Sequence, residues 1–211
     1  MGYTVDCKEH WERVYGAKQA TQVSWYALHL ERSVAMIRAA APASADIIDA
    51  GGGASTLVDD LLAFGYTKVS VLDVSSTALA VSKKRLGARA GMVKWIAGDV
   101  TSMHLPREAY DMWHDRTVFH FLTGPADRRA YVDLLTGSLK LGGHAIVATF
   151  SLEGPTRCSG LDVVRYSADN LSRELGPAFA LRQETHETHR TPSGVEQNLM
   201  YCLFERIKGA G

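Results

Sequence analysis

The chain reads Ile47-Ile48-Asp49-Ala50-Gly51-Gly52-Gly53-Ala54-Ser55 where an apolar run ends in an acid and leads into three consecutive glycines. Glycines between a strand and a helix remove every β-carbon from the turn, so a ligand can lie against bare backbone and the unpaired N–H groups of the helix. In an open α/β sheet, such a turn is where nucleotide-like molecules bind. The stretch therefore predicts an α/β fold with a ligand site at this turn.

Short apolar strands and amphipathic helices alternate around the glycine turn, from about residue 45 to residue 150. The expected strands cover residues 46–49, 69–73, 93–97, 111–114 and 144–150. The expected helices cover residues 55–64, 75–86 and 122–140. This alternation predicts a parallel sheet that is covered by helices on both faces.

The two ends of the chain depart from this alternation. Residues 4–41 are expected to be largely helical. After residue 150, a loop rich in Gly, Pro and Ser and a short helix over 168–175 lead to two strand-like runs, 179–190 and 195–207. The turn sequence Thr191-Pro192-Ser193-Gly194 separates these runs, so we expect them to pair as an antiparallel hairpin. At 211 residues, the whole chain fits one domain.

Composition argues against several classes of protein. The 23 basic and 23 acidic residues are interspersed and cancel, so no nucleic-acid partner is expected. Apolar runs such as 145–150 are too short to cross a bilayer, and the amino terminus lacks a secretion signal, so we expect no membrane partner and a cytoplasmic location. Cys7, Cys158 and Cys202 are odd in number and widely spaced, so neither disulfides nor a metal site is expected. Cys158 follows Arg157 in a loop, which leaves two interpretations, a reactive thiol or an inert one.

Acidic residues stand at the expected carboxyl ends of four strands, at Asp49, Asp73, Asp99 and Asp115. In an open parallel sheet, these ends form the rim of the ligand crevice. An acid about twenty residues beyond a glycine turn is placed to accept hydrogen bonds from a ribose diol, and Asp73 has that place. Asp99, one strand further along, either meets an adenine amino group or caps the next turn.

The glycine spacing separates two kinds of nucleotide-like site. NAD-binding proteins have the fingerprint Gly-x-Gly-x-x-Gly, whereas this chain has Gly51-x-Gly53-x-x-Thr56. The motif Asp49-x-Gly51-x-Gly53 resembles that of the class I S-adenosylmethionine-dependent methyltransferases. The resemblance covers most of the chain and also rests on Asp73, Gly98-Asp99, the turn Leu141-Gly142-Gly143 and the carboxyl-terminal hairpin. Ser55 is a departure, because many members of the family have a third glycine there.

The resemblance implies a Rossmann-like, mostly parallel seven-stranded sheet with helices on both faces and a C-terminal antiparallel hairpin. It also implies S-adenosyl-L-methionine as cofactor and S-adenosyl-L-homocysteine as product. Within a single methyltransferase domain over residues 1–211, residues 1–42 are the expected helical lid, 43–150 the cofactor-binding core, and 151–211 the acceptor-side loop, helix and hairpin. The implied cofactor-binding residues are Asp49 near the amino group, Gly51 and Gly53 at the methionine part, Asp73 at the ribose and Asp99 at the adenine. Val74 and Val100, which follow these last two acids, are also expected to bind the cofactor.

A second cluster of functional side chains, residues 113–122, follows the fourth strand, where sulfonium and acceptor meet in the resembling family. The candidate catalytic bases or orienting groups are His114, Asp115 and His120. Asp115 and Arg116 are alternatively a structural ion pair, and His120 is alternatively a packing residue. The candidate acceptor contacts are Trp25, Tyr26, Arg116, Cys158 and Tyr166.

The expected function is methyl transfer by in-line displacement to a small-molecule acceptor, with an oxygen, nitrogen or sulfur nucleophile. Such a transfer depends mainly on positioning and on excluding water, and it needs a base only when the attacking atom must lose a proton. A protein-lysine N-methyltransferase, in which Asp115 receives the lysine, is the nearest alternative. An NAD-linked oxidoreductase and a non-catalytic cofactor-binding module are the remaining ones.

Overall fold

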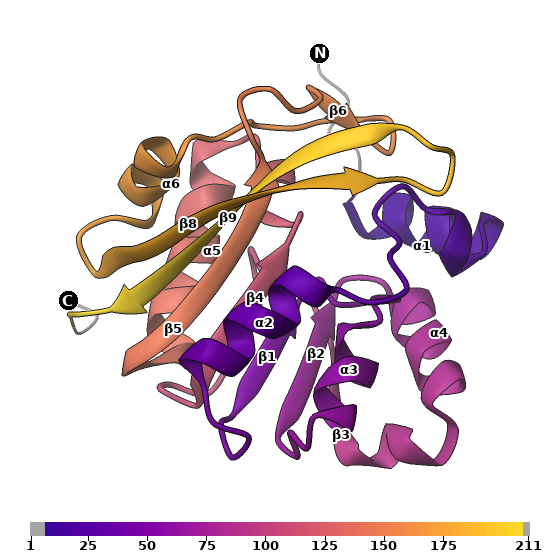
Figure 1. The fold of residues 1–211 in the computed structure, drawn as a ribbon, viewed down its shortest axis with the longest axis horizontal. Coiled ribbons are helices and arrows are strands. Elements are labelled where there is room, and N and C mark those ends of the chain that lie inside the picture. The colour runs from indigo at the N-terminus through magenta and orange to yellow at the C-terminus, as the bar shows by residue number, and fades with distance from the viewer. Residues whose placement is uncertain (1–6, 209–211) are drawn as a thin grey trace.

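A seven-stranded sheet forms the centre of the computed structural model, which describes residues 7–208 (Figure 1). Its strands are β1 (Ile47–Ala50), β2 (Val69–Asp73), β3 (Val93–Ala97), β4 (Tyr110–Arg116), β5 (Leu139–Phe150), β8 (Phe179–Arg190) and β9 (Glu196–Arg206). They lie in the order β3-β2-β1-β4-β5-β9-β8. Strands β1 to β5 pair in parallel, whereas β9 runs antiparallel to both of its neighbours, β5 and β8. The predicted mostly parallel sheet with a terminal antiparallel hairpin is confirmed.

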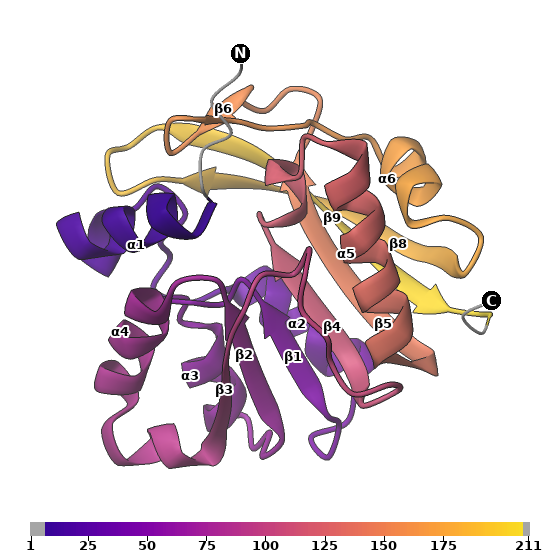
Figure 2. The same cartoon turned by 180° about the vertical axis from the view of Figure 1, so that it is seen from behind.

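Helices cover both faces of this sheet (Figure 2). They are α1 (Cys7–Ala17), α2 (Glu31–Ala40), α3 (Leu57–Ala63), α4 (Ser76–Leu86), α5 (Pro125–Ser138) and α6 (Ala168–Leu175). Ile47 and Val71 share a core with α2, α3 and α4, whereas Ile48 and Trp113 share one with α5 and α6. Neighbouring residues of a strand thus enter opposite cores, which explains why the central strands read as continuous apolar runs.

The chain order reverses at β1, because β2 and β3 lie on one side of it and β4 and β5 on the other. In an open α/β sheet, the crevice at the carboxyl ends of strands next to such a reversal is the preferred ligand site. The glycine turn follows β1 directly, so the fold places it at this crevice. Helix α1 lies beside α4 near the same end of the sheet (Figure 1).

Two predicted elements differ from the observed ones. The amino-terminal region is not one helical segment, because α1 and α2 are separated by a short 3-10 helix, η1 (Ala20–Gln22), and by an irregular stretch of turns and bends over residues 23–30. Residues 4–6 of that prediction lie outside the described part. Strand β5 begins at Leu139 and not at His144, because the pair Gly142-Gly143 forms an irregularity within the strand, with Gly142 at a φ of +76°.

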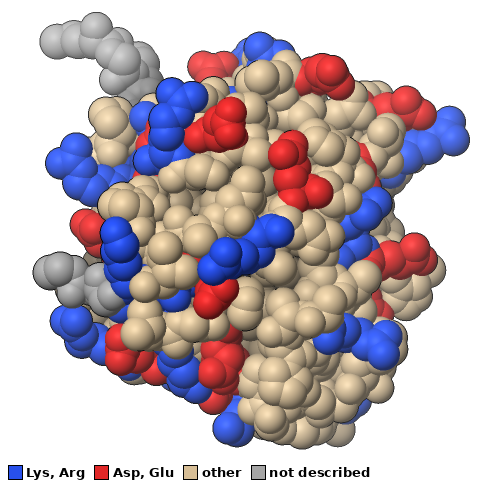
Figure 3. All heavy atoms as spheres, turned by 60° about the vertical axis from the view of Figure 1, so that its left-hand side comes forward, with Lys and Arg blue, Asp and Glu red and all other residues tan. Residues whose placement is uncertain are grey.

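The surface of the described chain bears mixed charges. Lys and Arg alternate with Asp and Glu across the face in Figure 3, without a large patch of one sign. Within residues 7–208, no helix combines the length and the apolar character needed to span a membrane.

Candidate active site

The glycine turn after β1 brings bare backbone against the ends of two other strands. Gly51 has a φ of +74°, and a β-carbon on it would lie 2.0 Å from Cγ2 of Val118. The N–H groups of Gly51 and Gly52 both donate to one carbonyl of β2, over 2.7 and 3.1 Å. A β-carbon on Gly53 would lie 2.4 Å from Oδ2 of Asp73. Glycine is therefore required in this turn, because a β-carbon would collide with Val118 of the loop after β4 or with the carboxylate of Asp73 at the end of β2.

Asp49 is buried at the end of β1 and keeps one oxygen free of hydrogen bonds. Its Oδ1 lies 2.7 Å from Nδ1 of His114, whose Nε2 lies 2.9 Å from Oγ of Ser33. Oδ2 has no partner among the described residues and faces the turn, where a β-carbon on Gly52 would come within 2.2 Å of it. A buried carboxylate oxygen without a partner is costly, so this atom marks a place for a ligand that donates hydrogen bonds.

Asp73 lies across the turn at the end of β2. Burial raises the pKa of its carboxyl to about 7, and the nearby carboxylates of Asp49 and Glu12 also raise it. Hydrogen bonds from the N–H groups of Ser75 and Gly53 lower this pKa but do not offset the effect of burial. Its Oδ1 accepts a hydrogen bond from the Ser75 N–H over 2.8 Å. The carboxylate is thus poorly solvated, and ligand hydroxyls that donate to it would favour its charged form.

Glu12 on α1 closes the start of α4. Its carboxylate accepts hydrogen bonds from the Ser75 hydroxyl at 3.0 Å, the Ser76 N–H at 2.7 Å and the Thr77 N–H at 3.2 Å. These donors, Thr77 foremost, hold the Glu12 pKa below its ordinary value. A carboxylate at a helix amino terminus satisfies N–H groups that the helix leaves free. Sequence reasoning missed this contact, because Glu12 and Ser75 are 63 residues apart and no local pattern joins them.

Residues 23–29, which we call the strap, cross over the glycine turn and are held by side chains of three other elements. Three of the bonds end on backbone carbonyls of the strap. The bonds run from His189 Nε2 to Ser24 O at 2.8 Å, from Arg116 Nη1 to Trp25 O at 2.9 Å and from Thr56 Oγ1 to Ala27 O at 2.9 Å. The strap is therefore attached to β8, to β4 and to the start of α3.

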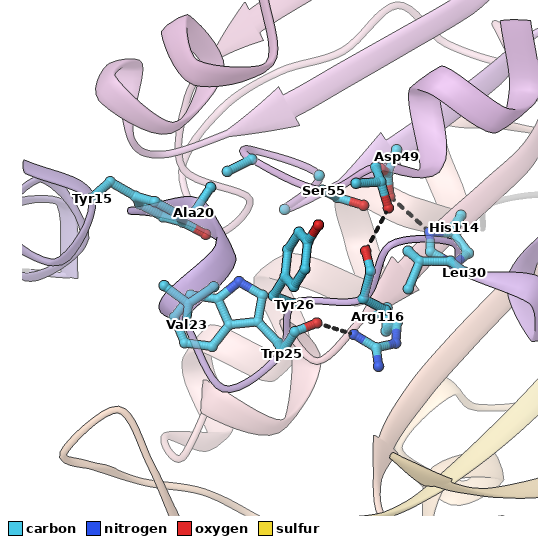
Figure 4. Close-up of a pocket in the computed structure, with 15 residues that line it drawn as sticks. Tyr15, Ala20, Val23, Trp25, Tyr26, Leu30, Asp49, Ser55, His114 and Arg116 are labelled. Carbon is cyan, nitrogen blue, oxygen red and sulfur yellow. Dashed lines mark hydrogen bonds and ion pairs between the residues drawn. The ribbon is translucent and has the colours of Figure 1, made fainter. Parts of the chain in front are cut away.

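A pocket lies between the strap and the glycine turn (Figure 4). Tyr15, Trp25 and Tyr26 line one side of it, and Tyr26 points from the strap toward Ser55 and Asp49. The hollow measures about 480 Å³ with its open mouth, but its enclosed free space is only about 30 Å³. That space holds about one water molecule. A nucleoside-sized ligand therefore fits only when residues around the pocket have shifted.

Six of the residues predicted from sequence meet at this pocket. They are Trp25, Tyr26, Asp49, Gly51, His114 and Arg116. Gly53 and Asp73 adjoin it through the turn, and Val74 follows as a half-buried residue. Asp99 accepts hydrogen bonds from N–H and Oγ1 of Thr101 over 2.8 and 2.7 Å, which is the turn-capping alternative, and Val100 is part of the core.

His114 and Asp115, both predicted as catalytic candidates, do not converge on one site. Strand β4 stays regular through Arg116, so the two side chains point to opposite faces of the sheet. Asp115 is fully buried and accepts hydrogen bonds from the N–H groups of Val118 and Phe119 and from the Tyr131 hydroxyl. Burial raises its pKa to about 6. The alternative ion pair with Arg116 is not formed either, because Arg116 faces Glu187 at 3.8 Å.

Three further predicted residues lie in the interior and not along the pocket. Burial and Arg116 lower the His120 pKa to about 3, so this ring is neutral, and its Nε2 has no partner in the described chain. Cys158 is buried, and burial raises the pKa of its thiol, which favours the inert one of its two interpretations. Tyr166 is buried against Phe119, with 5.5 Å between ring centroids, and so does not border an entrance.

Comparisons with known proteins agree with this geometry. Residues 47–143 match a family model described as a methyltransferase domain. The chain carries a methyltransferase domain. The recognition of a class I S-adenosylmethionine-dependent methyltransferase, drawn from the glycine and aspartate motifs, is thereby confirmed, and with it the prediction of an enzyme that uses this cofactor. None of the curated proteins compared with this methyltransferase matches it significantly.

Solved structures share the fold of this methyltransferase over nearly its whole length. One comes from work on the conversion of a disulfide bond into a thioacetal group during echinomycin biosynthesis, with a TM-score of 0.77, 20% identity and coverage of 95% of this chain and 93% of that one. A methyltransferase from Anabaena variabilis has a TM-score of 0.74, 16% identity and 96% coverage of each chain. The Burkholderia thailandensis 1,6-didemethyltoxoflavin-N1-methyltransferase has a TM-score of 0.68, 16% identity and coverage of 95% and 84%.

Proposed function

We propose that this methyltransferase transfers the methyl group of S-adenosylmethionine to a small-molecule acceptor by in-line displacement. The observation that carries the proposal is the pair of buried carboxylates, Asp49 and Asp73, on either side of a turn whose glycines present bare backbone. The free Oδ2 of Asp49 fits an ammonium group, and Asp73 fits the two hydroxyls of a ribose. The two ends of the cofactor thus have matching partners.

Further residues of the turn and of the neighbouring strands complete the cofactor site. Gly51 and Gly53 present backbone to the methionine part, and Asp99 accepts from the adenine amino group through the lone pairs that Thr101 leaves free. Val74 and Val100 pack beside the ribose and the adenine. The cofactor supplies the activated methyl group on a sulfonium. The protein positions it, and the closed strap excludes water from it.

The acceptor is proposed to be a small molecule that enters beside the aromatic side chains of α1 and the strap. Trp11 packs edge to face on Trp25 at 5.5 Å and on Phe121 at 5.1 Å, and Tyr15 lies 6.0 Å from Trp25. These rings lie next to the pocket and offer apolar contacts to a compact acceptor. The structural neighbour from Burkholderia, which holds 1,6-didemethyltoxoflavin, supports an acceptor of this size. A protein-lysine substrate is less favoured, because Asp115 is buried on the opposite face of the sheet.

The methyl transfer is proposed to proceed without proton removal by the three residues predicted as bases. Both ring nitrogens of His114 are engaged, and the Asp115 carboxylate receives three hydrogen bonds. His120 is neutral, because burial holds its pKa near 3, and its Nε2 is free to donate a hydrogen bond. Positioning of the reactants and their removal from water then supply most of the rate enhancement of the methyl transfer.

A binding and turnover experiment tests this function. Calorimetric titration should show binding of S-adenosylmethionine and S-adenosylhomocysteine but not of NAD, and Asp73→Ala should weaken both. A panel of small heterocyclic and amine compounds, run beside lysine-containing peptides, should then release S-adenosylhomocysteine with a small compound. If radiolabelled methyl groups are found on the peptides and on none of the small compounds, the small-molecule proposal is wrong and the protein-lysine alternative replaces it. Binding of NAD without binding of S-adenosylmethionine would overturn the whole assignment.

A further inference from the structure

A buried chain of polar side chains leads from β9 to the glycine turn. Nε of Arg116 donates to the Tyr201 hydroxyl over 2.9 Å, and the Ser33 side chain interacts with that same hydroxyl. Oγ of Ser33 lies 2.9 Å from Nε2 of His114, and Nδ1 of His114 lies 2.7 Å from Oδ1 of Asp49. The relative exposures of Ser33, His114 and Asp49 are 0%, 1% and 2%, so water does not compete for these bonds.

The proton positions in this chain follow from the acceptor at its end. A carboxylate only accepts, so Nδ1 of His114 carries the proton that Asp49 receives. Nε2 lies 2.9 Å from Oγ of Ser33 and shares a hydrogen bond with that hydroxyl. Both nitrogens of His114 are thus occupied inside the protein. The ring has no free atom to offer to a methyl acceptor, although it borders the pocket.

We propose that Ser33 and His114 are positioning residues for Asp49. By holding Oδ1, they fix the carboxylate so that Oδ2 faces Gly52, at the place where the ammonium group of the cofactor is received. The inference rests on the proposed function. A carboxylate without this support turns about its last torsion, which is broad and soft, and then no longer presents an oxygen to the ligand. Recognition of the ammonium group thus depends on a serine from α2 that never touches the ligand.

The test compares two ligands that differ in the ammonium group. S-adenosylhomocysteine carries it, whereas 5′-deoxy-5′-methylthioadenosine lacks the amino-acid part and retains the ribose and adenine. A residue that positions Asp49 matters for the first ligand only. A residue that merely supports the fold affects both. Calorimetric titration of each variant with both ligands therefore separates the two roles.

Two substitutions of the same histidine sharpen this test. The amide of Asn can take the place of Nδ1, and that of Gln can take the place of Nε2. His114→Asn should keep its bond to Asp49 and bind S-adenosylhomocysteine nearly as the wild type does. His114→Gln should weaken that ligand about tenfold, since a hydrogen bond to a charged group is lost, and should leave methylthioadenosine unchanged.

Serine substitutions supply a matched control. Ser33→Ala should weaken the affinity for S-adenosylhomocysteine about threefold to tenfold and leave the affinity for methylthioadenosine unchanged. The reason is that Nε2 of His114 then loses its partner, so the ring holds Asp49 less firmly. Ser138→Ala should change neither, because Ser138 is equally buried but bonds only to carbonyls of its own helix. Ser33→Ala removes only one buried oxygen and is therefore a smaller change than the histidine substitutions. It tests the positioning role even if the histidine variants fail to fold.

The outcomes distinguish this inference from the proposed function. If the wild type binds neither S-adenosylmethionine nor S-adenosylhomocysteine, the proposed function fails. If the wild type binds them but His114→Gln and Ser33→Ala keep the wild-type ratio of the two affinities, the function stands and the positioning role is overturned. Equal weakening of both ligands also overturns it, since that result assigns the two residues to the fold alone.

Discussion

Replacing Asp73 with asparagine should stabilise the unliganded protein above pH 7 and weaken its affinity for the cofactor. Burial raises the pKa of this carboxyl from 3.8 to about 7. Between about pH 4 and pH 7, the unfolded chain has therefore released a proton that the folded chain still binds, and the free energy of unfolding falls as pH rises. The difference between 3.8 and about 7 corresponds to about 4 kcal/mol at pH 8.

An asparagine at this position avoids the penalty of a buried charge. Its oxygen keeps the bond from the Ser75 N–H, but its amide group loses the favourable contact of the carboxylate with the Gly53 N–H, at a cost of about 1 kcal/mol. Asp73→Asn should therefore be more stable than the wild type by about 3 kcal/mol at pH 8. At pH 4 the two proteins should differ by about 1 kcal/mol or less.

Urea denaturation of both proteins from pH 4 to pH 8.5, followed by circular dichroism, measures this difference. If the difference in free energy of unfolding between the two proteins does not change with pH, the reasoning is refuted. That result would mean that burial does not hold the Asp73 carboxyl in its neutral form. Ligand binding gives an independent check. S-adenosylhomocysteine should bind the wild type more tightly as pH rises from 5 to 8, with release of a proton, and should bind Asp73→Asn about tenfold or more weakly.

Three further substitutions or reactions test other parts of the structure. Tyr131→Phe removes the hydroxyl that bonds to a buried carboxylate and a buried indole of β4, so urea denaturation should show a loss of about 2 to 3 kcal/mol with unchanged cofactor affinity. Gly51→Ala should abolish cofactor binding in calorimetry, whereas Gly65→Ala, at a φ of +86° with no atom within 4 Å of the new β-carbon, should cost only about 1 to 2 kcal/mol of stability. An aromatic disulfide reagent at pH 8 should modify the exposed Cys7 rapidly and Cys158 only on unfolding, because burial raises the Cys158 pKa. Rapid modification of Cys158 in the native protein would contradict its burial.

The parts of this fold that sequence predicted are those in which neighbouring residues carry the information. A strand, an acid and three glycines occupy consecutive positions, so the turn at Gly51 could be recognised directly. The hairpin could be recognised as well, because Pro192 and Gly194 specify a turn between two strand-like runs. Alternation along a strand also predicts opposite faces for neighbouring residues. The structure follows that rule at His114 and Asp115, which point to opposite faces of the sheet, because β4 continues two residues beyond its predicted end.

The parts that sequence could not predict depend on contacts between distant segments. Glu12 caps α4 across 63 residues, and the strap is held by Arg116 and His189 from two different strands. The resemblance predicted a helical lid over residues 1–42, but residues 23–30 are irregular and not helical. Because these residues are not helical, carbonyls of the strap can accept hydrogen bonds from side chains in place of helical hydrogen bonds. Contacts with distant segments, and not local propensity, determine this conformation.

The anchoring of the strap has a consequence for how this enzyme can change over evolutionary time. Ser24, Trp25 and Ala27 are each gripped through a main-chain oxygen, an atom that every amino acid provides. The side chains at positions 25 and 26, which face the pocket, are therefore interchangeable as far as attachment is concerned. Substitutions there can reshape the pocket while the strap stays fastened.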